Sequence, residues 1–444
     1  MFWNTGVTRT NTNKLILIIV IMLSAMILPS LEIRESLPRV RFDDAFIFGA
    51  FAINLLFWVT RRSHSGYGLG FVNQEVQRRA HRAVTIVFSL LFASMSISNL
   101  YAVFFLNGTF GLRDVMEFIT LAKYYLVITL TLSLEVQEGE FSVLSKTFLL
   151  GFGVMLLLTW SQFLNVFNVN AWLTPFFAQS HLDNLVNANP PRVLGSFDNP
   201  NVMGIVSVLM MTVFVTWYYF KRNDRLVAVM LVVATALAIK MTFMTISRTG
   251  FIATAAVLVF LSVWAMLKFH FKKEVLLKII ILLLVTLAVV FTSPRGFTTR
   301  LGEATDPKTS TSIQGHFLRA GPAIKFIQQS PVLGWGTAKN NMTTLVDDEY
   351  LLITRRYGFI GLAMYLWLFF RPVKAAWRRI SSFNSYNSQA GLRENKTLLA
   401  ITFVAATVAV LVYNITAGIF YNLQLMTLFA IFMGLIYRIE EESD

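Results

Sequence analysis

Long apolar runs dominate this chain of 444 residues. A helix needs about 20 mostly apolar residues to cross the hydrocarbon core of a bilayer, and only such helices or closed barrels can span it. Charged residues make up 14% of the chain, whereas soluble domains carry about 25%. We therefore predict an all-α polytopic membrane protein in which residues 1–444 form a single membrane domain. The twelve predicted spans are 15–31, 43–60, 83–106, 114–135, 143–166, 202–220, 226–245, 250–267, 277–293, 351–370, 397–416 and 420–437.

Lysine and arginine indicate the orientation of these spans. Cytoplasmic loops of membrane proteins carry an excess of both residues. Only one orientation places the basic clusters inside, so we predict that both termini are cytoplasmic and that the first span is an uncleaved signal anchor. The short acidic segment 136–142 is an exception. The four basic clusters lie in 61–82, 221–225, 268–276 and 371–396.

Composition and missing motifs exclude several classes of function. The net charge of +14 comes from the loop clusters, and no basic patch is interleaved with aromatic residues as a base-stacking surface requires. We therefore expect no nucleic-acid partner. The chain has no cysteine, which excludes disulfides, thiolate metal sites and cysteine nucleophiles. The absence of Walker, HExxH and GxSxG motifs and of clustered histidines argues against ATP-driven transport, zinc chemistry and a serine hydrolase.

Two long segments, 167–201 and 294–350, fall on the predicted outer face. Long loops on a helical scaffold often carry function. The stretch "PPRVLGSFDNPNVMG" (190–204) crosses from the end of the first segment into the next span, and its Asn199 and Asn201 can cap that helix. Arg192 in the same stretch is a candidate for binding substrate, because a fixed arginine can hold a phosphate through two parallel hydrogen bonds.

The stretch "TISRTG" joins two predicted spans through a very short turn. Arg248 in this turn must lie near the outer membrane interface. One interpretation is that its side chain extends toward lipid phosphates. We favour the other, a specific anionic ligand, because an arginine on the outer side opposes the usual charge bias.

The large outer loop contains "GHFLRAGPAIKFIQQ" over 315–329, which has helical periodicity. His316 and Arg319 are three residues apart and share a face. The "SPVLGWG" that follows predicts the end of this helix. We expect an apolar stripe to dock on the membrane bundle, formed by Phe317, Ala320, Ile324 and Ile327.

The stretch "VDDEYL" places Asp347, Asp348 and Glu349 directly before the tenth predicted span. Acids in the first turn of a helix cap free N–H groups and favour the macrodipole, which explains one or two of the three. Arg355 and Arg356 follow inside the span, where unpaired charges are costly. Contacts of Glu349 with Arg356, or of Asp348 with Arg355, would neutralise them.

Two further charges lie within the fourth predicted span. Glu117 and Lys123 are functional candidates because ionisable residues are rare inside membranes. Both lie within reach of the membrane surface or of other helices, so we rank them second.

Four stretches in this order also carry a family resemblance: "GSFDNPNVMG", "TISRTGFIA", "RAGPAIKFIQQSPVLGWG" and "DDEYLLITRRYGFIGLAMYL". Together they resemble the O-antigen ligase/polymerase superfamily of bacterial envelope enzymes, which includes the Wzy-type polymerases. In the third stretch, Arg319 and Gly336 match the family's pattern of an arginine followed by a glycine. The resemblance extends over about residues 80–437 and is best at 192–365.

This resemblance implies a fold, an activity and partners. The fold would be the bundle of lipid-dependent, GT-C-like glycosyltransferases, in the bacterial cytoplasmic membrane. Its members transfer a glycan from undecaprenyl diphosphate to an acceptor sugar on the extracytoplasmic face, with no metal or cofactor. The implied partners are the undecaprenyl-diphosphate-linked glycan donor, the acceptor, membrane lipids and a chain-length regulator. Arg248 and Arg319 match arginines on which the family relies, and they would hold the charge of the leaving diphosphate.

The sequence departs from the ligases of this family just before Tyr350, where they usually have histidine. Asp347 and Asp348 stand there instead, which favours a polymerase with one of them as catalytic base. His316 is the alternative base, and Glu349, Tyr350, Arg192 and Asn199 would contact substrate. A ligase that transfers finished glycan to lipid A core, protein or cell wall is the main alternative. A flippase for the same lipid is a third, but the chain lacks paired Gly/Pro-broken spans.

Overall fold

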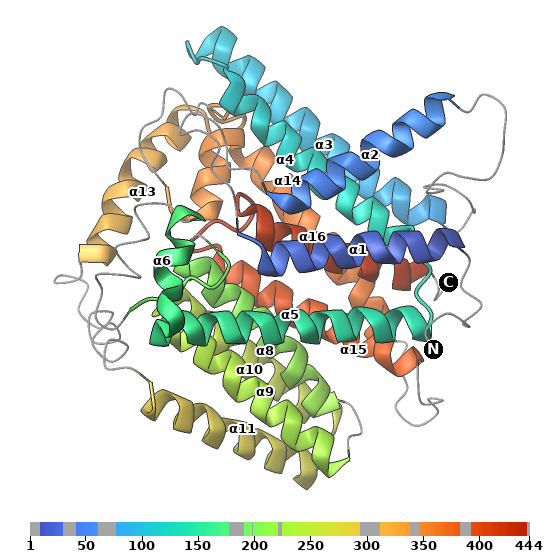
Figure 1. Ribbon diagram of the computed structural model, residues 1–444. Helices are drawn as coiled ribbons and strands as arrows, with labels where there is room; N and C mark the ends of the chain where they lie inside the picture. The colour runs from blue at the N-terminus through green and yellow to red at the C-terminus, as the bar shows by residue number, and fades with distance from the viewer. Residues whose placement is uncertain are drawn as a thin grey trace.

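The computed structural model describes residues 9–29, 41–60, 77–176, 191–197, 199–220, 224–293, 311–337, 346–381 and 392–441, and all regular structure in these ranges is helical (Figure 1). The N-terminal half contains α1 (Arg9–Ile27), α2 (Phe42–Thr60), α3 (Gln77–Phe105), α4 (Leu112–Leu132), α5 (Glu138–Leu164), the short α6 (Val169–Leu173) and α8 (Pro200–Phe220). The C-terminal half contains α9 (Arg225–Met244), α10 (Arg248–Lys268), α11 (Lys273–Phe291), α13 (Thr311–Gln329), α14 (Glu349–Ser381), α15 (Leu392–Tyr413) and α16 (Leu423–Glu441).

Each of the twelve predicted spans overlaps one of these helices. In the described residues, ten helices are long and apolar enough to cross a membrane, and the apolar part of α1 is shorter. The protein is therefore a polytopic all-α membrane protein, as its composition predicts. The count of twelve spans stays a prediction, because the side chains of α2 are described only as far as Ile53.

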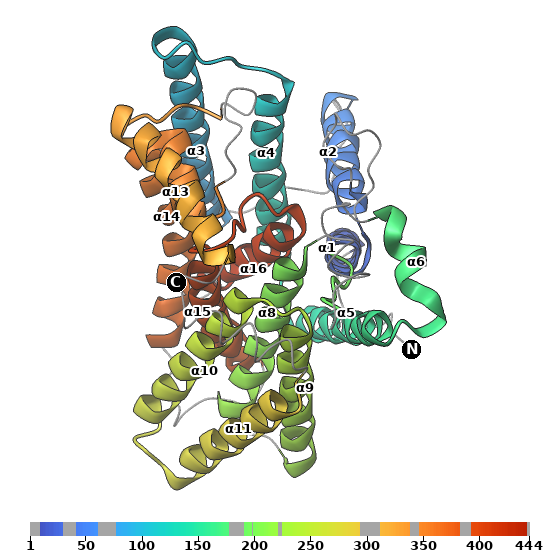
Figure 2. The ribbon, with the colours of Figure 1, turned by 90° about the vertical axis from the view of Figure 1, so that its left-hand side faces the viewer.

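Helices α8, α15 and α16 form the most deeply buried part of the bundle. The others surround them: α4 packs on α16, α9 and α10 pack on α8, and α14 packs on α15 and α3. Figure 2 shows α3, α4 and α14 in one half of the molecule and α8 to α11 in the other. Helix α11 lies outermost, and its exposed apolar side chains, such as Leu283 and Leu284, suit contact with lipid.

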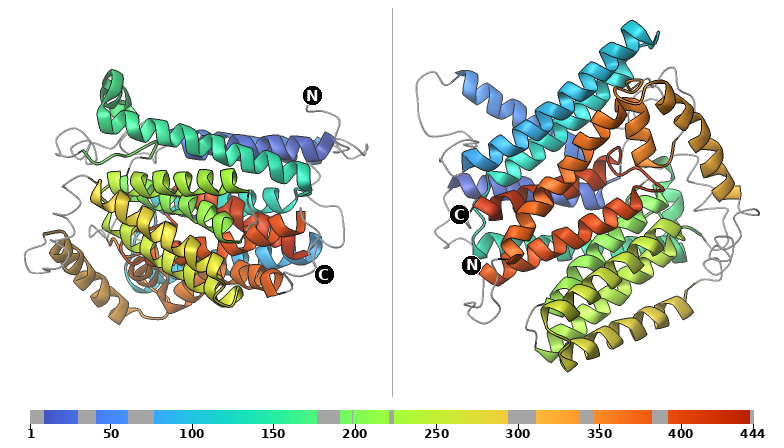
Figure 3. Two further views of the ribbon diagram at one scale, coloured as in Figure 1. Left: turned by 90° about the horizontal axis from the view of Figure 1, so that it is seen from below. Right: turned by 180° about the vertical axis from the view of Figure 1, so that it is seen from behind.

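Helix α13 lies outside the bundle and packs against α14 (Figure 3). It confirms the helix predicted over 315–329, but the predicted apolar stripe is partly wrong. Ile324 is 44% exposed, whereas Ala323 is fully buried. Because Arg319 stands one turn before Ala323, its side chain shares the face that turns toward α14. The side chains of His316 and Phe317 fall outside the described residues.

The segment after α13 is fixed to a break in α14. Gly358 has φ 64° and ψ −171°, a combination that only glycine adopts readily. The break exposes backbone groups of α14, and two hydrogen bonds use them. Trp335 N donates to Arg355 O at 2.9 Å, and Phe359 N donates to Pro331 O at 2.8 Å. A side chain on Gly358 would overlap the carbonyl of Val332.

The bundle has two chemically different ends. The start of α1 and the end of α16 lie at one end, and α13 extends toward the other (Figure 1). Basic residues occupy the first end, including Arg225, Lys272, Arg378 and Arg393. The predicted site residues lie at the second end, near the starts of α10 and α14. The basic clusters and the predicted site residues therefore lie at opposite ends of the helices, and which end faces the cytoplasm stays a prediction.

Candidate functional site

Three adjacent acids at the start of α14 have three different environments. Asp347 Oδ2 forms an ion pair with Arg319 Nη1 at 2.6 Å, and both side chains are accessible, at 28% and 49%. Asp348 Oδ1 accepts a hydrogen bond from Leu351 N at 2.8 Å and caps the helix. Glu349 is fully buried. The sequence prediction of partial capping is thus confirmed, and Asp348 provides it.

Glu349 turns toward the segment between α15 and α16. Its N–H donates to Asn414 O at 2.9 Å. Its carboxylate lies against Gly418, and the Phe420 backbone faces it. Neither carboxylate oxygen has a well-formed hydrogen bond within the described residues. A buried acid of this kind is costly, which makes Glu349 a candidate for contacting a polar ligand.

The charge of Arg356 is neutralised by a carboxylate on another helix. Its Nη1 lies 2.6 Å from Glu117 Oε1 on α4. Tyr357 Oη donates to the other Glu117 oxygen, and the Arg356 guanidinium stacks on the Tyr421 ring, 4.7 Å from its centroid. Burial and the Glu117 carboxylate raise the pKa of Tyr421 above its ordinary value, so it stays a neutral phenol. The ion pair of Arg356 is with Glu117 rather than with Glu349, although the Arg356 charge also acts on the buried Glu349 carboxylate.

Arg192 and Arg248, from the other two predicted motifs, both lie at the turn between α9 and α10. Arg192 Nε donates to Thr245 O at 3.1 Å, and its Nη2 donates to Asn201 Oδ1 at 3.4 Å. Arg248 follows in the same turn as the first residue of α10, which Ser247 caps through the Gly250 N–H at 3.2 Å. Residues more than fifty positions apart therefore form one basic rim.

The segment 414–422 connects these groups, and the sequence analysis missed it. The predicted spans 397–416 and 420–437 leave only three residues between them, but α15 ends at Tyr413 and α16 begins at Leu423. Thr416 hydrogen-bonds to Thr249, which is next to Arg248. Gly418 lies against the Glu349 carboxylate, and Tyr421 Oη donates to Glu117. Four apolar residues in "NITAGIFYN" disguised the turn as membrane helix. Its asparagines, threonine and glycine were the available signal.

The remaining predicted residues have local structural roles. Asn199 Oδ1 accepts from Asn201 N at 2.8 Å at the start of α8, which confirms its predicted capping. Tyr350 Oη donates to Leu411 O on α15 at 2.8 Å. Lys123 on α4 is buried in ion pairs with Asp43 at 2.6 Å and Asp44 at 2.5 Å. We interpret Lys123 as a structural link between α2 and α4.

Chemically, this end of the bundle suits an anionic ligand. It offers an accessible arginine beside an accessible carboxylate, and a second basic rim at the α9–α10 turn. Within the described residues, no cluster of three His, Asp or Glu side chains could hold a metal ion. Comparison with protein-family models and with curated proteins finds no match for this chain, so the family resemblance of its motifs rests on the sequence alone.

Proposed function

We propose that this protein polymerises oligosaccharide repeat units carried on undecaprenyl diphosphate. It would form glycosidic bonds on the extracytoplasmic face of the bacterial cytoplasmic membrane and so build a surface polysaccharide, such as O-antigen, capsule or exopolysaccharide. The observation that carries this proposal is the Arg319–Asp347 pair. Its members are 28 residues apart in sequence, yet their side chains meet at 2.6 Å and remain accessible.

The pair supplies both groups that glycosyl transfer requires. The acceptor hydroxyl attacks the anomeric carbon of the donor, and the bond from that carbon to the diphosphate oxygen breaks. Negative charge collects on the leaving diphosphate, and an arginine stabilises it through charge-assisted hydrogen bonds. Asp347 accepts the proton of the attacking hydroxyl. In the free protein these two groups neutralise each other, and the diphosphate competes with Asp347 for Arg319.

Arg248 is the second arginine of the proposed site. It lies at the α9–α10 turn, to which Arg192 donates a hydrogen bond. Thr416 hydrogen-bonds to Thr249 beside Arg248, which links this turn to the segment 414–422 next to Glu349. Two arginines on separate elements can both donate hydrogen bonds to the diphosphate and stabilise the negative charge that develops as the bond breaks, without a metal ion. Glu349 is fully buried next to the same segment, so its predicted contact with the acceptor sugar requires that segment to move.

The deciding experiment replaces Arg319 in cells that carry the native glycan pathway. We expect Arg319→Ala to insert normally but to abolish long glycan chains, so that only single repeats remain on a chain-length gel. Lys325→Ala is the matched control, because Lys325 is an exposed cation on the same helix. Normal chain lengths in Arg319→Ala would overturn the proposal.

The same assays separate the other two functions. In the absence of a ligase, finished polymer accumulates on undecaprenyl diphosphate, whereas in the absence of a polymerase single repeats accumulate. Purified protein in liposomes with lipid-linked repeats tests the flippase alternative, because a flippase makes no new glycosidic bond. Formation of longer lipid-linked chains in that system is the result that we expect.

A further inference from the structure

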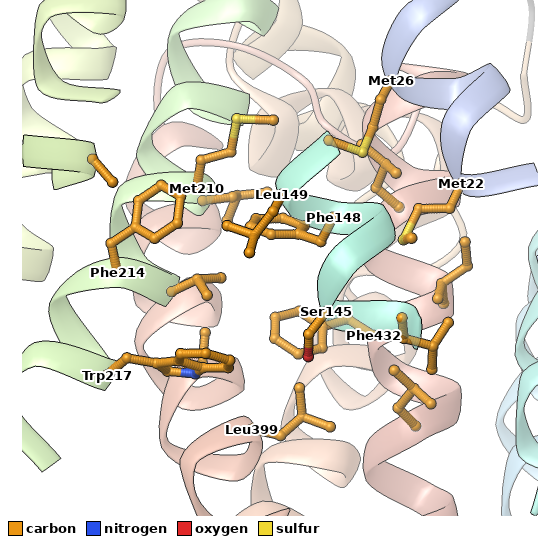
Figure 4. A pocket seen from close by; sticks show the side chains of 18 of the residues that line it. Met22, Met26, Ser145, Phe148, Leu149, Met210, Phe214, Trp217, Leu399 and Phe432 are labelled. Atoms are coloured by element: carbon orange, nitrogen blue, oxygen red, sulfur yellow. The ribbon is translucent and has the colours of Figure 1, made fainter. Parts of the chain in front are cut away.

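A large apolar cavity lies inside the bundle (Figure 4), and none of the proposed site residues lines it. Its volume is about 380 Å³. Side chains from α1, α5, α8, α9, α15 and α16 line it, and almost all of them are aliphatic, aromatic or methionine. Ser145 and Thr402 are the polar residues of the lining, and Thr402 Oγ1 already donates to Leu398 O within its own helix. The cavity therefore suits hydrocarbon.

The lining shows where the cavity opens. Met26 on α1 and Met210 on α8 also line the cavity and are buried, at 1% exposure each, so the cavity does not open beside them. Leu149 on α5 and Val227 and Met230 on α9 line the cavity too, but they are 50%, 39% and 62% exposed. The mouth therefore lies between α5 and α9 and opens sideways, toward the lipid that surrounds the bundle.

The mouth lies at the end where α5 and α9 begin, which carries two exposed cations beside the lining and the exposed acid Glu138 at the first residue of α5. Arg225 is the first residue of α9, two residues before Val227, and Lys146 follows Ser145 on α5. Both cations are exposed. The nearby Asp224 carboxylate is engaged as the cap of α9, where it accepts from Val227 N at 2.8 Å. Basic side chains at a membrane interface attract anionic lipid headgroups.

The size of the cavity limits its occupant. A cavity of about 150 Å³ accepts benzene, so 380 Å³ holds on the order of fifteen carbon atoms. That number corresponds to one phospholipid acyl chain and to only a fraction of a long polyprenyl chain. A polyprenyl donor held by Arg248 and Arg319 would also have its diphosphate at the opposite end of the bundle.

We propose that this cavity binds one acyl chain of an anionic phospholipid, which enters between α5 and α9 with its phosphate near Arg225 and Lys146. The proposal is independent of the transferase activity. The bound chain would fill the space between the α5/α9 side and the central helices α8, α15 and α16. The lipid would thus act as a structural component of the folded protein.

Photo-crosslinking in nanodiscs tests the proposal. The probe is phosphatidylglycerol with a diazirine near the end of one acyl chain, in a phosphatidylcholine bilayer. We expect labelling of Phe148, Trp217 and Met230. Val213→Trp should reduce this labelling about tenfold, because excluding about two methylene groups already costs that factor. Val233→Trp is the matched control, since Val233 lies on α9 but faces outward and is 51% exposed.

A charge variant leaves the cavity intact and tests the headgroup. Arg225→Gln should weaken labelling by phosphatidylglycerol, whereas Arg113→Gln, an exposed arginine at the opposite end, should not. Should Val213→Trp fail to fold, wild-type labelling and Arg225→Gln still decide. The proposal would be overturned if Phe148, Trp217 and Met230 were labelled no more strongly than the lipid-facing residues of α11. Stronger labelling by a diazirine-bearing undecaprenyl phosphate would overturn it too. Equal labelling by phosphatidylcholine and phosphatidylglycerol probes would overturn the choice of an anionic lipid.

Discussion

At the residue scale, the three adjacent acids at the start of α14 have different partners because each side chain points in a different direction. Asp347 turns outward to Arg319, Asp348 turns back onto its own helix, and Glu349 turns into the protein. Chemically similar acids thus receive different partners over a distance of only two residues. Substitutions that remove one charge at a time can therefore separate capping from catalysis.

We expect Asp347→Asn to lower the rate of glycan polymerisation by about 10²–10⁴-fold, the usual contribution of a general base. Asp348→Asn should leave the rate nearly unchanged, because asparagine caps a helix about as well as aspartate. The measurement is the rate of chain extension by purified protein in liposomes. A greater loss in Asp348→Asn than in Asp347→Asn would transfer the role of base to Asp348.

Gly418 provides a test of the buried acid. A side chain at this position would overlap the Glu349 carboxylate, and overpacking typically costs about 1–3 kcal/mol. We expect Gly418→Ala to lower the melting temperature in nanodiscs, and Glu349→Ala in the same chain to recover part of the loss. Gly153→Ala is the control, because nothing lies within 4 Å of a Cβ there. Purely additive effects of the two substitutions would show that the carboxylate is not packed against Gly418.

The sequence predicted these residues unevenly, for a physical reason. Capping depends on the next few residues, so the role of the acidic triplet in capping was predictable. The partner of Arg356 is Glu117, 239 residues away, and only the packing of α4 against the rest of the bundle brings the two together. The pairing of Arg319 with Asp347 is also nonlocal, although the motifs had placed both residues on the same face of the membrane.

At the element scale, the join between α13 and α14 depends on local conformations that a hydropathy pattern does not reveal. The helix over 315–329 was predictable because its periodicity is local. Its docking face was not, since the contact with α14 selects the row through Arg319, Ala323 and Phe326. The break at Gly358 was missed because a single glycine in an apolar stretch is usually tolerated within a helix.

We expect Gly358→Ala to detach this join. The backbone conformation of Gly358 costs another residue about 1–3 kcal/mol, and the added methyl group would overlap Val332. Hydrogen exchange should become faster over 330–337 and in α13, and glycan polymerisation should fall because Arg319 loses its position. Gly321→Ala on α13 has no neighbour within 4 Å and should change neither. Unaltered exchange in Gly358→Ala would contradict the role of this break.

At the scale of the whole molecule, composition predicts the class of fold but not the arrangement of helices. Apolar residues that face lipid and apolar residues that face another helix look alike in sequence, since lipid tails are as apolar as leucine. The burial of α8, α15 and α16 and the outermost place of α11 are consequences of packing. Buried polar links, such as Glu117 with Arg356, indicate which helices are adjacent only after the structure is known.

The orientation of the whole bundle is the last and broadest prediction. The chain has no cysteine, so a single introduced cysteine reports its own accessibility. Gln328→Cys lies on α13, the helix that carries Arg319, and Lys272→Cys lies just before the start of α11; both positions are exposed. Because lysine and arginine favour the cytoplasmic side, a membrane-impermeant maleimide should label Gln328→Cys in intact spheroplasts and Lys272→Cys only after permeabilisation. The reverse pattern would place Arg319 and Asp347 in the cytoplasm. That result would remove the basis for extracytoplasmic glycan transfer while leaving the helical packing and the acyl-chain cavity as they stand.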